Sequence, residues 1–143
     1  MKKTSIHDCL LIPLPKIITE AGSITAINGL ADLPFEIKRV YYLYDVPGGI
    51  DRGGHAHKEL QQLIVAASGS FDLVINDGQQ KMMFNLNRPF WGVLMPSGLW
   101  RELTNFSSGS ICLVLASHEY DESDYIRDFN EYLLYKRKYG IHI

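Results

Sequence analysis

The sequence predicts an all-β protein, a sandwich or barrel of short strands that ends in one short helix. Between residues 37 and 96, runs rich in β-branched and aromatic residues alternate with clusters of turn residues. Asp77-Gly78 separates two of these runs and is a strong hairpin signal. Near the C-terminus, apolar residues recur at helical spacing instead. A chain of 143 residues can bury one core, so we expect a single domain over residues 1–143.

The expected strands follow the apolar runs along the chain. Ile17 and Ile18, together with residues 22–27, predict a small N-terminal hairpin. The β-branched and aromatic run over residues 40–44 is closed by a turn cluster that contains Pro47 and two glycines. Further strands are expected over residues 60–66, 71–76, 81–86, 91–95 and 110–116.

A helix is expected after the last strand. Asp121 can cap its N-terminus, and Asp124 lies in the favourable first turn. Residues 136–138 are basic and suit its C-terminus, and Gly140 suits its end. We interpret its apolar stripe as a packing face against the barrel rather than a cofactor site, and the stripe comprises Tyr125, Ile126, Phe129, Tyr132 and Leu133.

Composition excludes several classes of function. The formal net charge is −2 and the basic residues do not cluster with aromatics, so we expect no nucleic-acid partner. No apolar run is long enough to cross a bilayer. Cys9 and Cys112 share no motif spacing and are expected to be free thiols in a reducing compartment. Pro13 and Pro15 break the only early apolar stretch, so we expect a cytoplasmic rather than a secreted protein.

Two stretches resemble the conserved motifs of the cupins with part of the metal ligands removed. In the first, Gly49 is followed by five residues and then by His55-Ala56-His57, and Gly69 closes the pattern. Gln62 stands where cupins carry a metal-binding glutamate. The second stretch, residues 96–105, keeps its proline, glycine and asparagine but has Arg101 in the slot of the metal-binding histidine.

These replacements predict a cupin-like jelly-roll barrel whose pocket works without a metal. Divalent cations prefer neutral imidazoles and carboxylates, whereas an amide is a weaker ligand. The guanidinium of Arg101 stays charged and would repel a cation. We therefore expect neither a metal nor another cofactor.

His55 and His57 are the candidate catalytic residues. Their i, i+2 spacing places both imidazoles on one face of a strand. Without a metal to bind, they are free for proton transfer, since an ordinary histidine titrates near pH 6.5. The alternative is a pair of partly exposed loop histidines, but the glycine spacing around them favours the site.

Cationic and aromatic residues around the histidines are candidates for substrate binding. Arg52 stands three residues before His55 beside two glycines, and a guanidinium there can hold a phosphate or carboxylate. Trp100 next to Arg101 can offer a flat surface beside a cation. The full set of substrate-binding candidates is Arg39, Tyr42, Arg52, Gln62, Trp100 and Arg101.

The chain also resembles a narrower group, the sugar 3,4-ketoisomerases, from about Ile17 to near Tyr132. The resemblance lies in residues 37–42, 52–58, 114–117 and 120–127, together with the Trp100-Arg101 pair. It implies a dTDP-4-keto-6-deoxyglucose substrate, a 3-keto product used for deoxyamino sugars, and a homodimer with exchanged N-terminal strands. It also implies that His55 and His57 act as acid and base and that Arg52 belongs to the substrate pocket.

The resemblance further implies the stereochemistry of the product. Family members carry Arg or His after the tryptophan, and Arg101 favours the equatorial, gluco-configured 3-ketosugar. Just before Gly22-Ser23 the family usually presents Arg or Tyr, whereas this chain has Ala21. We expect His57 to remove the C3 proton and His55 to be its partner. Arg101 or Tyr42 would then stabilise the enediolate oxygen.

Three other functions are compatible with the pattern. A metal-dependent cupin enzyme would need a carboxylate near Gln62, and Glu59 is the nearest candidate. A non-catalytic nucleotide-sugar-binding module would keep Arg52 and Trp100 but would not need the two histidines. A 3,5-epimerase of related sugars is a third possibility.

Overall fold

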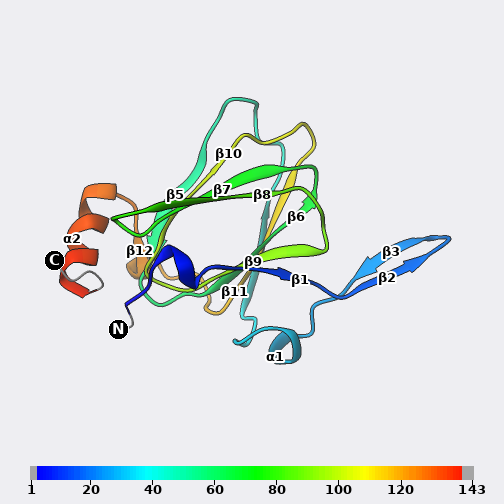
Figure 1. The fold of residues 1–143 in the computed structure, drawn as a ribbon, viewed down its shortest axis with the longest axis horizontal. Coiled ribbons are helices and arrows are strands. Elements are labelled where there is room, and N and C mark those ends of the chain that lie inside the picture. Colours follow the sequence, from blue (N-terminus) through cyan, green and yellow to red (C-terminus); the bar gives the residue numbers. More distant parts are fainter. Residues whose placement is uncertain (1–2, 140–143) are drawn as a thin grey trace.

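Two five-stranded sheets pack face to face in the structure, a computed structural model that describes residues 3–139 (Figure 1). The first sheet has the order β1-β9-β6-β11-β4, with strands Leu10–Pro13, Trp91–Met95, Gln62–Ser68, Ile111–Ala116 and Arg39–Leu43. The second has the order β12-β5-β10-β7-β8, with strands Tyr125–Ile126, Arg52–His57, Trp100–Thr104, Phe71–Asn76 and Lys81–Leu86. The pairings within both sheets are antiparallel, as in a jelly roll, so the predicted fold class is confirmed.

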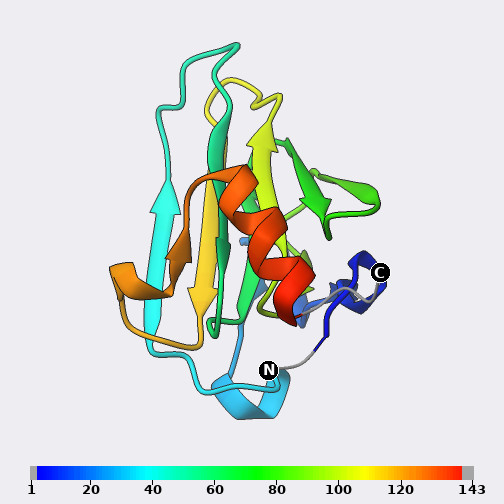
Figure 2. The ribbon, with the colours of Figure 1, turned by 90° about the vertical axis from the view of Figure 1, so that its left-hand side faces the viewer.

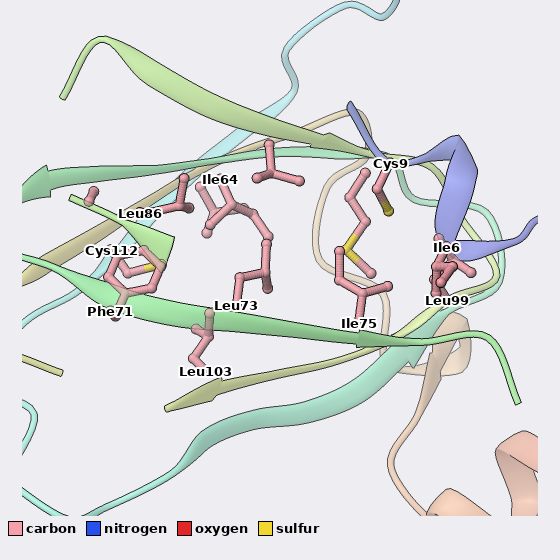
Figure 3. Packing of buried hydrophobic residues seen from close by; sticks show 14 residues of the cluster. Ile6, Cys9, Ile64, Phe71, Leu73, Ile75, Leu86, Leu99, Leu103 and Cys112 are labelled. Atoms are coloured by element: carbon pink, nitrogen blue, oxygen red, sulfur yellow. The ribbon is translucent and has the colours of Figure 1, made fainter. Parts of the chain in front are cut away.

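The main core lies between the two sheets (Figure 3), and β7 contributes to it by strict alternation. Phe71, Leu73 and Ile75 of β7 are fully buried, while the residues between them are only half-buried. They face Ile64 of β6 and Val114 of β11 within one apolar cluster. The Asp77-Gly78 turn joins β7 to β8 as predicted, and Gly78 takes the positive φ of 94° that the turn requires.

The N-terminal segment adds a short 3₁₀ helix and a projecting hairpin. The 3₁₀ helix, Ile6–Asp8, is closed by a reciprocal capping box between Ser5 and Asp8. β2 (Lys16–Thr19) and β3 (Gly22–Thr25) form the predicted hairpin, which extends away from the body of the molecule (Figure 1). The short helix α1 (Gly29–Asp32) follows it.

The C-terminal helix begins later than predicted. The side chain of Asp121 accepts a hydrogen bond from the Ser123 N–H and caps a 3₁₀ turn, Glu122–Asp124, rather than the helix. Tyr125 and Ile126 then form β12, because they pair with the edge of β5. Helix α2 spans Phe129–Tyr139, and the side chain of Asp128 accepts the Asn130 N–H at its start. Gly140, the expected end of the helix, lies outside the described residues.

Helix α2 covers the outer face of the second sheet, where Figure 2 shows it lying across the strands. Phe129 and Tyr132 contact the ring of Trp100, with centroids 5.2 and 5.7 Å away. The interpretation of the stripe as a packing face is therefore confirmed for Ile126, Phe129, Tyr132 and Leu133. Tyr125 is the exception, because its ring lies against His55 and His57 of β5. Within residues 3–139, no helix is long and apolar enough to cross a membrane.

Candidate active site

A cavity of about 430 Å³ lies between the two sheets and the segment that precedes α2. Its walls come from β4, β5, β10 and residues 120–127, which are far apart in the sequence. Most of its lining is polar or aromatic, unlike the apolar core next to it. The lining residues are Arg39, Tyr41, Leu43, Arg52, Gly54, His55, Arg101, Tyr120, Tyr125 and Arg127.

The two histidines lie together at the inner end of this cavity. Because β5 is extended, His55 and His57 share its inward face, and their ring centroids are 4.9 Å apart in an edge-to-face arrangement. Only His55 lines the cavity, and His57 lies deeper. Tyr125, opposite His57 on β12, places its ring 4.3 Å from the His57 ring.

Both histidines are held in the neutral form. Burial away from water, followed by the positive charge of Arg101, lowers the pKa of His55 to about 2. The same two causes lower the pKa of His57 to about 4, and the carboxylate of Asp124 opposes them. At neutral pH each ring therefore has one nitrogen lone pair that can accept a proton.

Asp124 supports His57 from the side of Nδ1. Its Oδ2 lies 3.2 Å from His57 Nδ1 and also accepts the Leu60 N–H at 3.3 Å. Its Oδ1 accepts the Glu59 N–H at 2.7 Å. The Nε2 atoms of His55 and His57 are buried and have no hydrogen-bond partner among the described residues.

Arg101 lies directly opposite His55 on the neighbouring strand β10. It is almost fully buried, and its Nη2 donates to the Tyr41 hydroxyl at 2.9 Å. Its Nε and Nη1 groups have no partner among the described residues. Buried donors of this kind need an acceptor, so the cavity is prepared for an oxygen atom of a ligand.

Three more arginines stand around the cavity. Arg39 donates to the Tyr125 hydroxyl at 3.1 Å and lies over the Tyr41 ring. Arg127 forms a two-pronged ion pair with Glu122, at 2.8 and 2.9 Å. Arg52 is exposed, and within residues 3–139 its side chain forms neither an ion pair nor a hydrogen bond.

The cavity brings together His55, Arg39, Arg52 and Arg101, with His57 behind them. Tyr42 was expected there, but it points to the opposite face of β4, where it is 57% exposed, and Tyr41 faces the cavity instead. Side chains alternate along a strand, so only one of two adjacent tyrosines can face inward.

Trp100 was expected to offer a stacking surface in the same cavity, and this placement is also wrong. Its neighbour Arg101 takes the inward position, so the indole lies on the outer face beneath α2. There its Nε1–H donates to Glu102 Oε1 at 3.0 Å.

Gln62 lies inside the barrel on β6, with its Nε2 3.7 Å from the sulfur of Met95 and its Oε1 unpartnered among the described residues. Gln62 is not among the residues that line the cavity. No three His, Cys, Asp or Glu side chains within residues 3–139 converge on a possible metal position. Independence from metal remains a prediction that follows from Arg101 and Gln62.

Five polar site residues were not predicted: Tyr41, Tyr120, Asp124, Tyr125 and Arg127. Tyr120, Asp124 and Arg127 belong to a segment that the family resemblance marks. Local periodicity assigns Asp124 and Arg127 to a helix, and Tyr120 lies just before its expected cap. The short pairing of β12 with β5 brings this segment to the cavity. A sequence signal did exist, because the Tyr-Asp-Glu run is unusually polar for a buried helical face.

Comparison with known proteins assigns a family. The family model described as "FdtA: WxcM-like, C-terminal" matches residues 7–137. A curated TDP-4-oxo-6-deoxy-alpha-D-glucose-3,4-oxoisomerase from Aneurinibacillus thermoaerophilus is 40% identical over 131 residues, which cover 92% of this chain and 94% of the relative.

Solved structures agree with that assignment. The 3,4-ketoisomerase QdtA from Thermoanaerobacterium thermosaccharolyticum, a histidine-to-asparagine mutant in complex with TDP-4-keto-6-deoxyglucose, is 36% identical with a TM-score of 0.93. The match covers 96% of this chain and all of that one. The WlaRB TDP-quinovose 3,4-ketoisomerase from Campylobacter jejuni is 43% identical with a TM-score of 0.85, over 90% and 99% of the two chains. On the extent of these matches, the chain belongs to the FdtA family.

Proposed function

We propose that the protein is a 3,4-ketoisomerase that converts dTDP-4-keto-6-deoxyglucose into dTDP-3-keto-6-deoxyglucose. The observation that carries the proposal is a pair of neutral histidines beside the buried Arg101–Tyr41 pair, in a cavity whose other walls carry arginines. The family members described above act on substrates of this class or bind them. A purely binding module would keep the arginines but would not need two adjacent imidazoles at the inner end of the cavity.

The chemistry requires two proton shifts and no redox partner. The C3 proton lies α to the C4 ketone, so a neutral imidazole can remove it, and the electron pair forms an enediolate whose charge rests on O4. Arg101 and the Tyr41 hydroxyl are placed to stabilise that oxyanion. Protonation at C4 and at O4, with loss of the O3 proton, leaves the ketone at C3.

The roles of the histidines follow from their depth. The sequence favours His57 as the base, but His55 lines the cavity and His57 lies behind it. We therefore assign removal of the C3 proton to His55. We assign His57, whose ring lies next to that of His55, to the second proton transfer of the reaction.

For the diphosphate of the substrate, Arg52 is the best-placed cation. Arg39 and Arg127 already bind Tyr125 and Glu122, whereas Arg52 is exposed at the cavity and can turn toward a phosphate.

The product is expected to be gluco-configured, with an equatorial C4 hydroxyl. In a gluco ring the C3 hydrogen of the substrate and the C4 hydrogen of this product lie on opposite faces. The base that takes the C3 proton therefore cannot return it to C4, and a second donor must act from the other face. The 43% identity to a TDP-quinovose ketoisomerase supports this outcome, because quinovose is 6-deoxyglucose.

The test is incubation with dTDP-4-keto-6-deoxyglucose in deuterated buffer, followed by NMR of the fresh product. We expect a 3-keto sugar with a large H4–H5 coupling in residual protonated molecules and nearly complete deuterium at C4. Unchanged substrate would overturn the proposed activity, and a small coupling would overturn the stereochemistry. Pretreatment with a chelator should leave the rate unchanged, and a loss restored by a divalent ion would contradict metal independence.

We further propose a homodimer in which the β2–β3 hairpin is exchanged between copies. The hairpin pairs with no other strand of the described chain, and a lone two-stranded hairpin is only marginally stable. Ile17, Ile18 and Ile24 on it are 57%, 73% and 57% exposed. Exposed apolar surface of this extent indicates an interface.

Light scattering during size-exclusion chromatography should therefore give twice the mass of the chain. Ile18→Lys should shift the protein toward monomer. Leu134→Lys, which alters an exposed leucine on α2, should leave the dimer intact. A monomeric wild type would contradict the proposal.

We propose a cytoplasmic location, where thiols stay reduced, because Cys9 and Cys112 are free, buried thiols.

A further inference from the structure

The carboxylate of Asp124 is held rigidly against one nitrogen of His57. It receives N–H groups from Glu59 and Leu60 in addition to its contact with His57 Nδ1. The Asp124 carbonyl also accepts the Lys58 N–H at 2.9 Å, and the next residue, Tyr125, pairs with His57 across the strands. Asp124 is therefore anchored by backbone contacts on both of its oxygens and cannot turn away from the imidazole.

The chemistry of the pair dictates which nitrogen carries the proton. An ionised carboxylate can only accept hydrogen bonds, so His57 must present Nδ1 as N–H. In a neutral imidazole the other nitrogen, Nε2, then holds the lone pair. That atom is buried and has no partner among the described residues, so the structure leaves it free to accept a proton.

We propose that Asp124 is a positioning residue that holds His57 in the Nδ1–H form, so that any proton His57 handles passes through Nε2. The catalytic part of this inference rests on the proposed ketoisomerase activity. The tautomer itself does not, because it follows from the Asp124–His57 geometry alone.

Asp124→Asn is the informative variant. The Oδ1 atom makes the shorter backbone bond, to the Glu59 N–H at 2.7 Å, so an asparagine keeps its oxygen there. Its NH₂ group then faces His57 Nδ1 and donates to it, which forces the Nε2–H form. The Leu60 N–H, whose 3.3 Å bond to Oδ2 is the longer of the two backbone bonds, loses its acceptor in this variant. The main change is that the proton moves to the wrong nitrogen, which costs about 10⁴-fold in a comparable carboxylate–histidine pair.

The experiment is nitrogen-15 NMR of histidine-labelled enzyme, with the His57 signals assigned by their loss in His57→Asn. The wild type should show the Nδ1–H form and Asp124→Asn the Nε2–H form. With dTDP-4-keto-6-deoxyglucose, Asp124→Asn should lower kcat by about 10²–10⁴-fold and change KM little. Asp121→Asn, the same change at the exposed cap three residues earlier, should retain the wild-type tautomer and kcat.

The outcomes separate this inference from the proposed function. A wild-type Nε2–H signal, or an unchanged tautomer in Asp124→Asn, would overturn the inference whatever the activity. A switched tautomer with unchanged kcat would also overturn it. If the wild type fails to turn over the sugar, the proposed function fails, and the spectra still decide how Asp124 acts on His57. If Asp124→Asn does not fold, the wild-type spectrum alone still tests the inference, because an Nε2–H signal from His57 would overturn it.

Discussion

Arg101 sets the electrostatics of the cavity. It occupies a position where cupins place a metal-binding histidine, and it is 2% exposed. After burial itself, its charge is the next largest cause of the lowered pKa of both His55 and His57. A fixed cation thus does two things: it keeps both bases unprotonated, and it offers donors to a developing oxyanion.

Replacement of either histidine should abolish most turnover without unfolding the protein. His55→Asn and His57→Asn should each lower kcat by about 10²–10⁴-fold, the usual worth of one acid or base. Dissociation constants for dTDP should stay near wild type, because the diphosphate is expected to bind through Arg52 rather than through the two imidazoles. The control is His7→Asn, an exposed histidine near the N-terminus. Full turnover by either active-site variant would remove that residue from the catalytic step.

Arg52→Ala should weaken binding more than it harms the fold. Loss of one charge-assisted hydrogen bond costs about 1.5–3 kcal/mol, or roughly ten- to a hundred-fold in the dissociation constant for dTDP measured by calorimetry. Arg88→Ala provides a matched control, since Arg88 is exposed outside the cavity lining. An unchanged dissociation constant in Arg52→Ala would place the diphosphate at another arginine.

Among the elements, helix α2 supports the strand that carries Arg101. The Tyr132 hydroxyl lies 2.9 Å from the Gly98 carbonyl and 3.1 Å from that of Asn76. Gly98 in turn donates its N–H to the His57 carbonyl at 2.7 Å. The helix therefore holds the turn before β10 and, through it, the end of β5.

Tyr132→Phe tests this support. Removal of the hydroxyl deletes its hydrogen bond to the buried Gly98 carbonyl, so the free energy of unfolding should fall by about 1–3 kcal/mol in urea titrations. Tyr44→Phe, which alters an exposed tyrosine, should change stability by less than about 0.5 kcal/mol. Equal effects in the two variants would show that the Tyr132 hydroxyl contributes no net stability.

For the molecule as a whole, two neutral buried histidines make stability depend on pH. In the unfolded chain both titrate near the ordinary value of 6.5, whereas in the folded protein their pKa values are about 2 and 4. As pH falls below about 6.5, the unfolded state therefore binds more protons than the folded state, and folding loses stability.

The expected slope is up to about 1.4 kcal/mol per pH unit for each histidine, between roughly pH 6 and pH 4. Urea denaturation of the wild type and of His57→Asn at several pH values measures it. The variant should show a shallower fall because one of the two groups is gone. Identical slopes in the two proteins would mean that His57 is not held neutral by the fold.

Local pattern was sufficient for most strands of this protein and for its jelly-roll class. β8 and β9 fall on the predicted residues because each is a short, mostly apolar run bounded by turn residues. β10 was not predicted. Its inward-facing position next to Trp100 holds the charged Arg101, where a strand normally places an apolar residue, so hydropathy does not mark it as a strand. The two histidines and Arg52 were found because motif spacing, rather than hydropathy, marks them.

Tertiary structure alone decided which residues complete the site. Tyr41 and Tyr42 are locally equivalent, and only packing of β4 against β11 shows which one faces inward. The placement of Asp124 depends on β12 pairing with β5 across 67 residues of sequence, so helical periodicity was misleading there. Sequence patterns report the environment that neighbouring residues create along the chain. A catalytic cavity is built from side chains that meet only when distant strands pair, and that information is carried by no local pattern.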